Sequence, residues 1–243
     1  GSGIISNRGR RNTMRGKALL FILLFAFPPG NRGFCQNVQG EFEEDVEAIT
    51  EEAPPEIAPG DHIEEVPLDT LTADEARGLL KMREEEKLAR DVYLKLHELW
   101  EIPIFRSIAS SEERHMAAVK GLLDAYGLDD PVKSKAVGEF SDPEFTKLHD
   151  ELIKKGKKSL LDALIVGATI EELDIRDLNE LLLKTDKADI SRVYENLRRG
   201  SINHLRSFVE RIGEAGGEYR AQFLKEAELD SLLKAFSGRG KGR

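Results

Sequence analysis

The chain has 243 residues, of which 40% are hydrophobic and 33% charged, and its formal net charge at pH 7 is -9. This length and apolar content suit one sizeable domain with tails, and the negative charge argues against a nucleic-acid-binding surface. The single cysteine, Cys35, excludes an intrachain disulfide and any cysteine-based zinc or iron–sulfur cluster within this sequence. Few aromatic residues and many Leu, Glu, Lys and Ala residues are typical of an all-α protein.

The first part of the chain has the pattern of an export signal. Residues 1–13 are interpreted as a leader, or as residues added ahead of Met14. Residues 14–37 start with basic side chains and continue with an apolar run of signal-peptide length, which is too short to span a bilayer comfortably. We therefore predict an exported, extracytoplasmic protein without a membrane span in its mature domain. The location would be cytoplasmic if residues 14–37 are not a signal peptide.

The next segment, residues 38–68, is acidic and contains proline, with no lysine or arginine between Glu41 and Glu65. Such a composition cannot bury enough apolar surface to order itself, so we predict a disordered linker. The folded domain is predicted to span residues 69–230. Residues 231–243 are predicted to be a basic flexible tail.

Within the predicted domain, apolar side chains recur at helical spacing. The sequence Thr72-Ala-Asp-Glu75 is a capping box, which predicts the start of a helix that ends near Trp100. Further helices are predicted over residues 105–126, 142–156, 159–185, 188–214 and 218–236. The helix over 142–156 is short and is expected to connect two longer pairs.

The helix over residues 105–126 carries two polar side chains on its apolar face. Its heptad stripe is Phe105, Ile108, Glu112, His115, Val119, Leu122 and Tyr126. A buried carboxylate without a partner is costly, and an imidazole beside it compensates only in part. A metal ion is therefore the leading explanation for Glu112 and His115, and two satisfied core residues are the alternative.

The two halves of the predicted domain resemble each other. The sequence Glu85–Asp91 matches Glu171–Asp177, and the region of Glu112 and His115 matches that of Ser201 and His204. Repeated helix pairs predict two αα-hairpins in one four-helix bundle, with a crossover connection and extra short helices. The repeat places five polar side chains at the middle of otherwise apolar stripes: Glu86, Glu112, His115, Glu172 and His204.

These motifs resemble known families. Glu86-Lys-Leu-Ala-Arg-Asp-Val-Tyr93 and Ile108-Ala-Ser-Ser-Glu-Glu-Arg-His115 resemble the first two helices of rubrerythrins. The stretch from about Leu71 to Tyr219 resembles the domain of unknown function 2202, a ferritin-like family of bacteria and archaea. The resemblance implies a ferritin-like bundle with a carboxylate-bridged centre of two metal ions. Iron is the expected metal, and manganese or zinc could also use these ligands.

The resemblance also implies roles for the polar residues. Glu86 would bind one ion, Glu112 would bridge, and His115 would bind the first ion. Glu172 and His204 would serve the second half of the site. Ser201 departs from the family pattern, because a glutamate is expected at this position.

Other polar residues complete the expected site. Glu171 is a substitute for the missing carboxylate, and Asp174 is a more distant one. Tyr93 is an expected catalytic residue, with core packing as its alternative. Arg90 and Arg176 either hold the ligands in position through ion pairs or form purely structural salt bridges.

The function implied by this site is redox chemistry with a small oxidant: reduction of peroxide, or oxidation of Fe(II) by oxygen or peroxide. This chain lacks the cysteine-rich electron-transfer domain of rubrerythrins, so an unknown electron donor would be needed. One alternative is a non-catalytic metal-binding or metal-sensing envelope protein. A second is a structural helical bundle in which the glutamates pair with Arg90 and Arg176. The sequence leaves a homodimer open.

Overall fold

The computed structural model describes residues 71–234, which form helices and connecting segments without a β-strand among them. The helices are α1 (Ala73–Trp100), α2 (Pro103–Ala125), α3 (Pro143–Gly156), α4 (Leu160–Leu182), α5 (Ala188–Glu214) and α6 (Glu226–Lys234). The predicted all-α bundle is confirmed. The predictions for the leader, signal peptide and acidic linker, and for most of the basic tail, lie outside the described residues.

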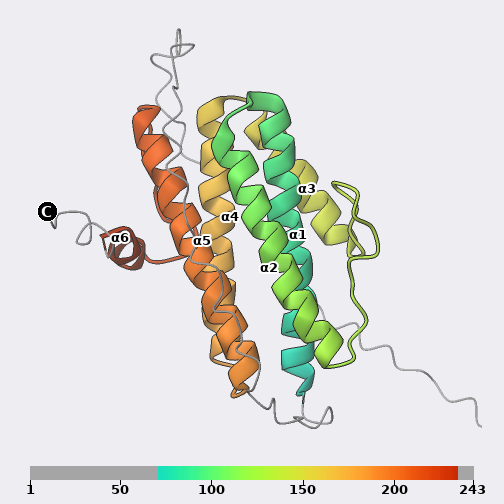
Figure 1. The fold of residues 1–243 in the computed structure, drawn as a ribbon. Coiled ribbons are helices and arrows are strands. Elements are labelled where there is room, and N and C mark those ends of the chain that lie inside the picture. Colours follow the sequence, from blue (N-terminus) through green and yellow to red (C-terminus); the bar gives the residue numbers. More distant parts are fainter. Residues whose placement is uncertain (1–70, 235–243) are drawn as a thin grey trace, which may run out of the picture. The chain divides into compact units, whose positions relative to one another are not determined.

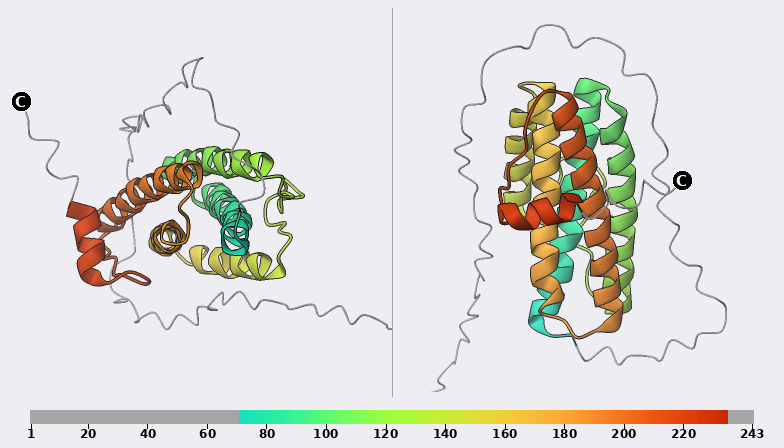
Figure 2. Two further views of the ribbon diagram at one scale, coloured as in Figure 1. Left: turned by 90° about the horizontal axis from the view of Figure 1, so that it is seen from below. Right: turned by 90° about the vertical axis from the view of Figure 1, so that its left-hand side faces the viewer.

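Four long helices, α1, α2, α4 and α5, run side by side as a bundle (Figure 1). The pairs α1–α2 and α4–α5 are each joined by a short connection, and α1 also contacts α4 while α2 contacts α5. The shorter α3 packs against α1 and α4 and carries the chain from the end of α2 back to the start of α4 (Figures 1 and 2). This is the predicted crossover. None of the helices within residues 71–234 is long and apolar enough to cross a membrane.

Local sequence signals determine where α1 begins and ends. The Thr72 hydroxyl accepts a hydrogen bond from the Glu75 backbone N–H at 3.1 Å, and the Glu75 carboxylate accepts one from the Thr72 N–H at 2.8 Å. This confirms the predicted capping box. Glu101 ends the helix in the left-handed region at φ 54°, and Pro103 then begins α2, so the hairpin between them is tight.

The crossover segment is attached to α1 by a buried ion pair. Lys87 and Asp91 are both fully buried, and their charged atoms lie 2.5 Å apart. The Lys87 ammonium also donates to the Ala136 carbonyl and lies over the Phe140 ring, and Asp91 accepts from the Gly138 N–H. These contacts hold one side of α1 against the crossover and leave its other side to face α2 and α4.

The interior consists of two apolar clusters, one toward each end of the bundle. The first contains Tyr93, Phe105 and Phe208, and the second contains Leu79 and Tyr194. Along the chain, Glu86 on α1, Glu112 and His115 on α2, and His204 on α5 fall between the members of the first cluster and those of the second. The bundle therefore has a polar belt between two dry ends.

The last part of the described chain differs from the prediction. A helix was expected over residues 218–236, but within the described part of this range, residues 218–234, the helical residues are Glu226–Lys234. The backbone N–H groups of residues 222–224 donate to the Glu172 carboxylate, so they cannot enter a helical ladder. Helix α6 then lies across α5 (Figure 2), where Arg206 donates to the Leu232 carbonyl. The end of α6 falls in the segment that was predicted to be a tail.

The closeness of α4 and α5 depends on Gly167. A Cβ at this position would lie 2.5 Å from two ring carbons of Phe208. We expect Gly167→Ala to lower the free energy of unfolding by about 1–3 kcal/mol, because the rigid ring must shift. Gly121→Ala is the matched control, since an added Cβ would meet nothing within 4 Å apart from its chain neighbours and the nearby backbone of α2, and it should stabilise α2 by about 0.5–1 kcal/mol. Urea unfolding of both variants tests this, and equal effects would contradict it.

Candidate metal centre

The polar belt holds a cluster of ionisable side chains from all four long helices. Its members are Glu86 of α1, Glu112 and His115 of α2, Glu171 of α4 and His204 of α5. Each of these five residues is at most 8% exposed. We call this set the belt cluster.

One half of the belt cluster is built by α1 and α2. The His115 Nδ1 atom lies 2.8 Å from Glu112 Oε2 and 3.2 Å from Glu86 Oε2. One ligand atom from each of these three residues can be chosen so that all lie within 4.8 Å of one another. Glu112 and His115 are three residues apart, so they share one face of α2.

The other half adds α4 and α5. The His204 Nδ1 atom lies 2.9 Å from Glu112 Oε1 and 3.5 Å from Glu171 Oε2. Ligand atoms of Glu112, Glu171 and His204 also lie within 4.8 Å of one another. Glu112 belongs to both groups, one carboxylate oxygen facing each imidazole, and the two imidazole centroids are 5.7 Å apart. Two adjacent groups of side chains that share one carboxylate could therefore each hold a cation.

Several polar atoms of the belt cluster have no hydrogen-bond partner. These buried atoms are Glu86 Oε1, Glu112 Oε1 and His204 Nδ1. Glu112 Oε1 and His204 Nδ1 lie 2.9 Å apart, but the two groups are not oriented for a hydrogen bond. Such unsatisfied buried groups are costly unless another species completes them. Carboxylate oxygens and imidazole nitrogens are ligands for iron, manganese and zinc, so the residues present fit a metal centre.

The charges of the belt cluster are tightly linked. Burial opposes the charged form of Glu112, but His115 and His204 outweigh it and bring the pKa of Glu112 well below its ordinary value. Burial raises the pKa of Glu86 to about 8 against the attraction of His115. The His204 pKa is raised to about 10, because Glu112 and Glu171 outweigh the effect of burial. In the metal-free protein, the positive charge of the protonated imidazoles compensates the negative charge of the carboxylates.

Tyr93 belongs to the first apolar cluster, and its hydroxyl contacts the belt cluster. Its hydroxyl donates to Glu171 Oε1 at 2.5 Å and lies 3.3 Å from the Gly167 carbonyl oxygen. Burial, and then the negative charge of Glu171, raise the pKa of Tyr93 well above its ordinary value. The hydroxyl is therefore held as a neutral donor that orients the Glu171 carboxylate. Its expected catalytic role stays a prediction.

Glu172 does not lie in the belt cluster where the repeat had placed it. Its carboxylate accepts from the Tyr219 hydroxyl at 2.6 Å and from the N–H groups of Phe223 and Leu224, each at 2.7 Å. Glu171 points inward instead. Adjacent residues on a helix differ in direction by about 100°, so a shift of one residue in the alignment of the repeats exchanges these positions. The small residues Ala163 and Gly167 on the inward stripe were the signal that marks Glu171.

The two arginines expected beside the ligands lie elsewhere. Arg90 donates to Asp91 and to the Lys135 carbonyl, so it supports the crossover. Arg176 pairs with Asp177 at 2.5 Å and lies over the Phe223 ring. Of the expected alternatives, these contacts correspond to structural salt bridges. Ser201 donates to Asp174 at 2.5 Å, next to the belt cluster.

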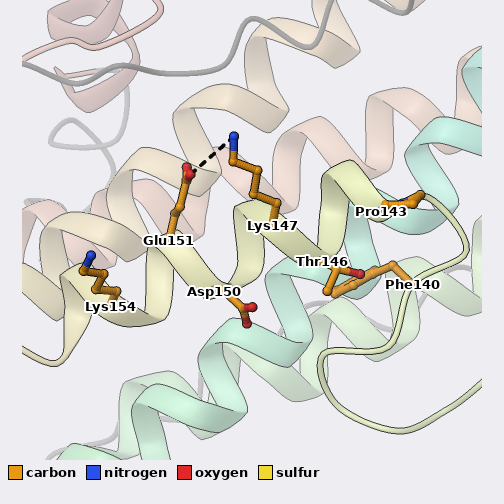
Figure 3. Close-up of a pocket in the computed structure, with 7 residues that line it drawn as sticks. All are labelled: Phe140, Pro143, Thr146, Lys147, Asp150, Glu151 and Lys154. Carbon is orange, nitrogen blue, oxygen red and sulfur yellow. Dashed lines mark ion pairs between the residues drawn. The ribbon is translucent and has the colours of Figure 1, made fainter.

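A surface pocket lies along α3 (Figure 3). It is lined by Phe140, Pro143, Thr146, Lys147, Asp150, Glu151 and Lys154. Two of these residues, Lys147 and Glu151, are one turn apart on α3 and form an ion pair at 3.8 Å. None of the lining residues belongs to the belt cluster, so the pocket is separate from the candidate centre.

The Glu172 contacts predict a specific weakness of the C-terminal segment. Glu172→Gln keeps the size of the side chain but removes its charge and one of the acceptor oxygens. We expect residues 219–234 to exchange their amide hydrogens faster, and the free energy of unfolding to fall by about 1–3 kcal/mol. Glu180→Gln, at an exposed position of the same helix, is the control. Unchanged exchange in residues 219–234 would contradict the prediction.

The belt cluster also predicts how the metal-free protein responds to pH. Glu86 with a pKa of about 8 and His204 with a pKa of about 10 keep protons that the unfolded chain releases near its ordinary values of 4.5 and 6.5. The folded state therefore binds more protons over this interval, and its stability must fall as pH rises. Thermal unfolding in chelator from about pH 5 to about pH 10 checks this. Glu86→Gln should remove the lower part of the decline, and a rising melting temperature would refute it.

Known proteins share this sequence and fold. A domain family described as "Uncharacterized protein domain (DUF2202)" matches residues 75–236. "Uncharacterized protein MJ0754" of Methanocaldococcus jannaschii is 48% identical over 183 residues, which cover 75% of this chain and 99% of that protein. The crystal structure of hypothetical protein MJ0754 from Methanococcus jannaschii is similar with a TM-score of 0.67 and 49% identity, and the match covers 69% of this chain and 96% of that one. By this sequence match the chain belongs to the DUF2202 family.

Proposed function

We propose that this protein binds two metal ions in the belt cluster and uses them in redox chemistry with peroxide or oxygen. The observation that carries the proposal is the pair of ligand groups that share Glu112. One group alone would suit a single ion. Two groups with a common carboxylate suit two ions held close together.

The ligand types favour iron. Glu86 and Glu171 come from two helices, and Glu112 with His115 forms a Glu-x-x-His pair on a third helix. This is close to the ligand arrangement of ferritin-like dimetal carboxylate bundles, in which the fourth helix also carries a Glu-x-x-His pair. Here the fourth helix supplies His204 with Ser201. Manganese and zinc remain alternatives, since they accept the same donor atoms.

The burial of the belt cluster matches a small substrate. With each ligand residue at most 8% exposed, only a small molecule can reach the centre without unfolding the bundle. Bound iron would supply electrons and polarise an O–O bond. The chain itself would exclude bulk water, place Glu112 between the two sites, and orient Glu171 through the Tyr93 hydroxyl. A separate electron donor would restore the reduced state.

Metal loading of the full chain tests the first half of the proposal. We expect two Fe(II) ions per chain after loading without oxygen and removal of free metal. The double substitution Glu112→Ala with His115→Ala should abolish this binding, because Glu112 belongs to both groups. Glu113→Ala, an exposed neighbour on α2, is the matched control and should bind as the wild type does.

Turnover tests the second half. The loaded protein should consume one hydrogen peroxide for every two Fe(II) oxidised, since peroxide takes two electrons and two protons to give two waters. Absorbance of Fe(III) and a peroxide assay follow both sides of this balance. Two bound ions without any oxidation beyond that of free Fe(II) would refute the redox function and leave a metal-binding protein. No bound metal, with the fold unchanged, would refute the metal centre.

A further inference from the structure

We propose that Asp174 is a fourth carboxylate ligand of this centre, on the ion held by Glu86, Glu112 and His115, and that Ser201 positions it. The inference rests on the proposed dimetal site. It assigns to α4 the carboxylate that the family resemblance expected at position 201 on α5.

Two contacts between α1 and α4 show the level at which Asp174 lies. The Tyr93 hydroxyl contacts Glu171 Oε1 at 2.5 Å, and the Lys81 ammonium contacts Asp177 Oδ2 at 2.5 Å. Asp174 lies between the two α4 residues, and Glu86 lies between the two α1 residues. Since both pairs of contacts run along the same antiparallel interface, Asp174 is level with Glu86.

Contacts between α4 and α5 show the direction in which Asp174 faces. His204 lies 3.5 Å from Glu171, and the Ser201 hydroxyl lies 2.5 Å from Asp174 Oδ2. Each helix contributes residues three apart, so these are two consecutive rungs on one interior face. Asp174 is therefore one turn from a belt-cluster carboxylate and on the same side of α4.

The neighbourhood of Asp174 is short of positive charge. Burial, and then the negative charge of Glu86, raise the pKa of Asp174 well above its ordinary value, and Glu171 and Glu112 act in the same direction. The Glu86 Oε1 atom, which is buried, has no hydrogen-bond partner. Asp174 is half-buried, and neighbouring carboxylates that water solvates poorly are favourable only with a proton or a cation between them. A metal ion bound by both would satisfy each of them.

Ser201 suits a positioning role. Its hydroxyl donates to one oxygen of Asp174, which leaves the other oxygen available as a ligand. Hydrogen bonds of this kind orient metal-binding carboxylates and affect metal affinity. A serine is also too short to reach the centre itself, and its small volume leaves room for a carboxylate from the neighbouring helix.

The test is equilibrium dialysis of the full chain against Fe(II) without oxygen, with metal measured by elemental analysis. Asp174→Asn should keep one ion at wild-type affinity and bind the other at least about tenfold more weakly. Ser201→Ala should weaken the same ion by a smaller factor. Asp186→Asn, at an exposed position between α4 and α5, is the matched control and should bind both ions normally.

The outcomes separate this inference from the function on which it rests. Fewer than two ions in the wild-type protein would refute the dimetal centre itself. Two ions in the wild type with unchanged binding in Asp174→Asn, or loss of both ions, would overturn the role of Asp174. Circular dichroism in chelator checks that the variant folds. If it does not, Ser201→Ala decides: selective weakening of one ion supports the inference, and unchanged binding overturns it.

Discussion

The burial of three glutamates and two histidines at mid-height of a helical bundle is the constraint on which the rest of the structure depends. Charged groups in a dry interior need partners, and the ion pairs that the belt cluster makes within residues 71–234 are among its own glutamates and histidines. Protons can provide part of the compensation, as the raised pKa of His204 shows. Metal ions would provide more, because they also satisfy the buried oxygen and nitrogen atoms that lack hydrogen bonds.

The surrounding structure holds these side chains at one level. Apolar clusters lie on both sides of the belt, so displacement of any ligand along the bundle would place a charge among residues such as Leu79 or Phe208. On the outer side of α1, the buried Lys87–Asp91 ion pair and the hydrogen bond from the Gly138 N–H to Asp91 attach the crossover. These contacts fix how α1 is rotated about its own axis. On α4, Glu172 acts in the same way, because it binds the segment before α6 and leaves Glu171 directed inward. Adjacent glutamates thus have separate roles because their side chains point about 100° apart around one helix.

The family relationship and the site contribute different information about this protein. Membership of the DUF2202 family and the similarity to MJ0754 establish that this sequence and fold recur, without stating an activity. The reasons to propose metal chemistry come from the chain itself: two ligand groups, one shared carboxylate, and polar atoms without partners. Tyr93 contacts Glu171 of this centre, and Ser201, which stands where a glutamate was expected, contacts Asp174.

The sequence by itself determined the helices, the repeat, the crossover and most residues of the belt cluster, because helical periodicity places a polar residue on an apolar stripe without reference to other segments. It could not decide between Glu171 and Glu172, since both are buried and the choice depends on the rotation of α4. It also could not show that residues 219–224 leave the helical path to bind Glu172, or that Ser201 faces Asp174. Only the tertiary structure decided these points, because each depends on which side of one helix meets another segment distant in sequence.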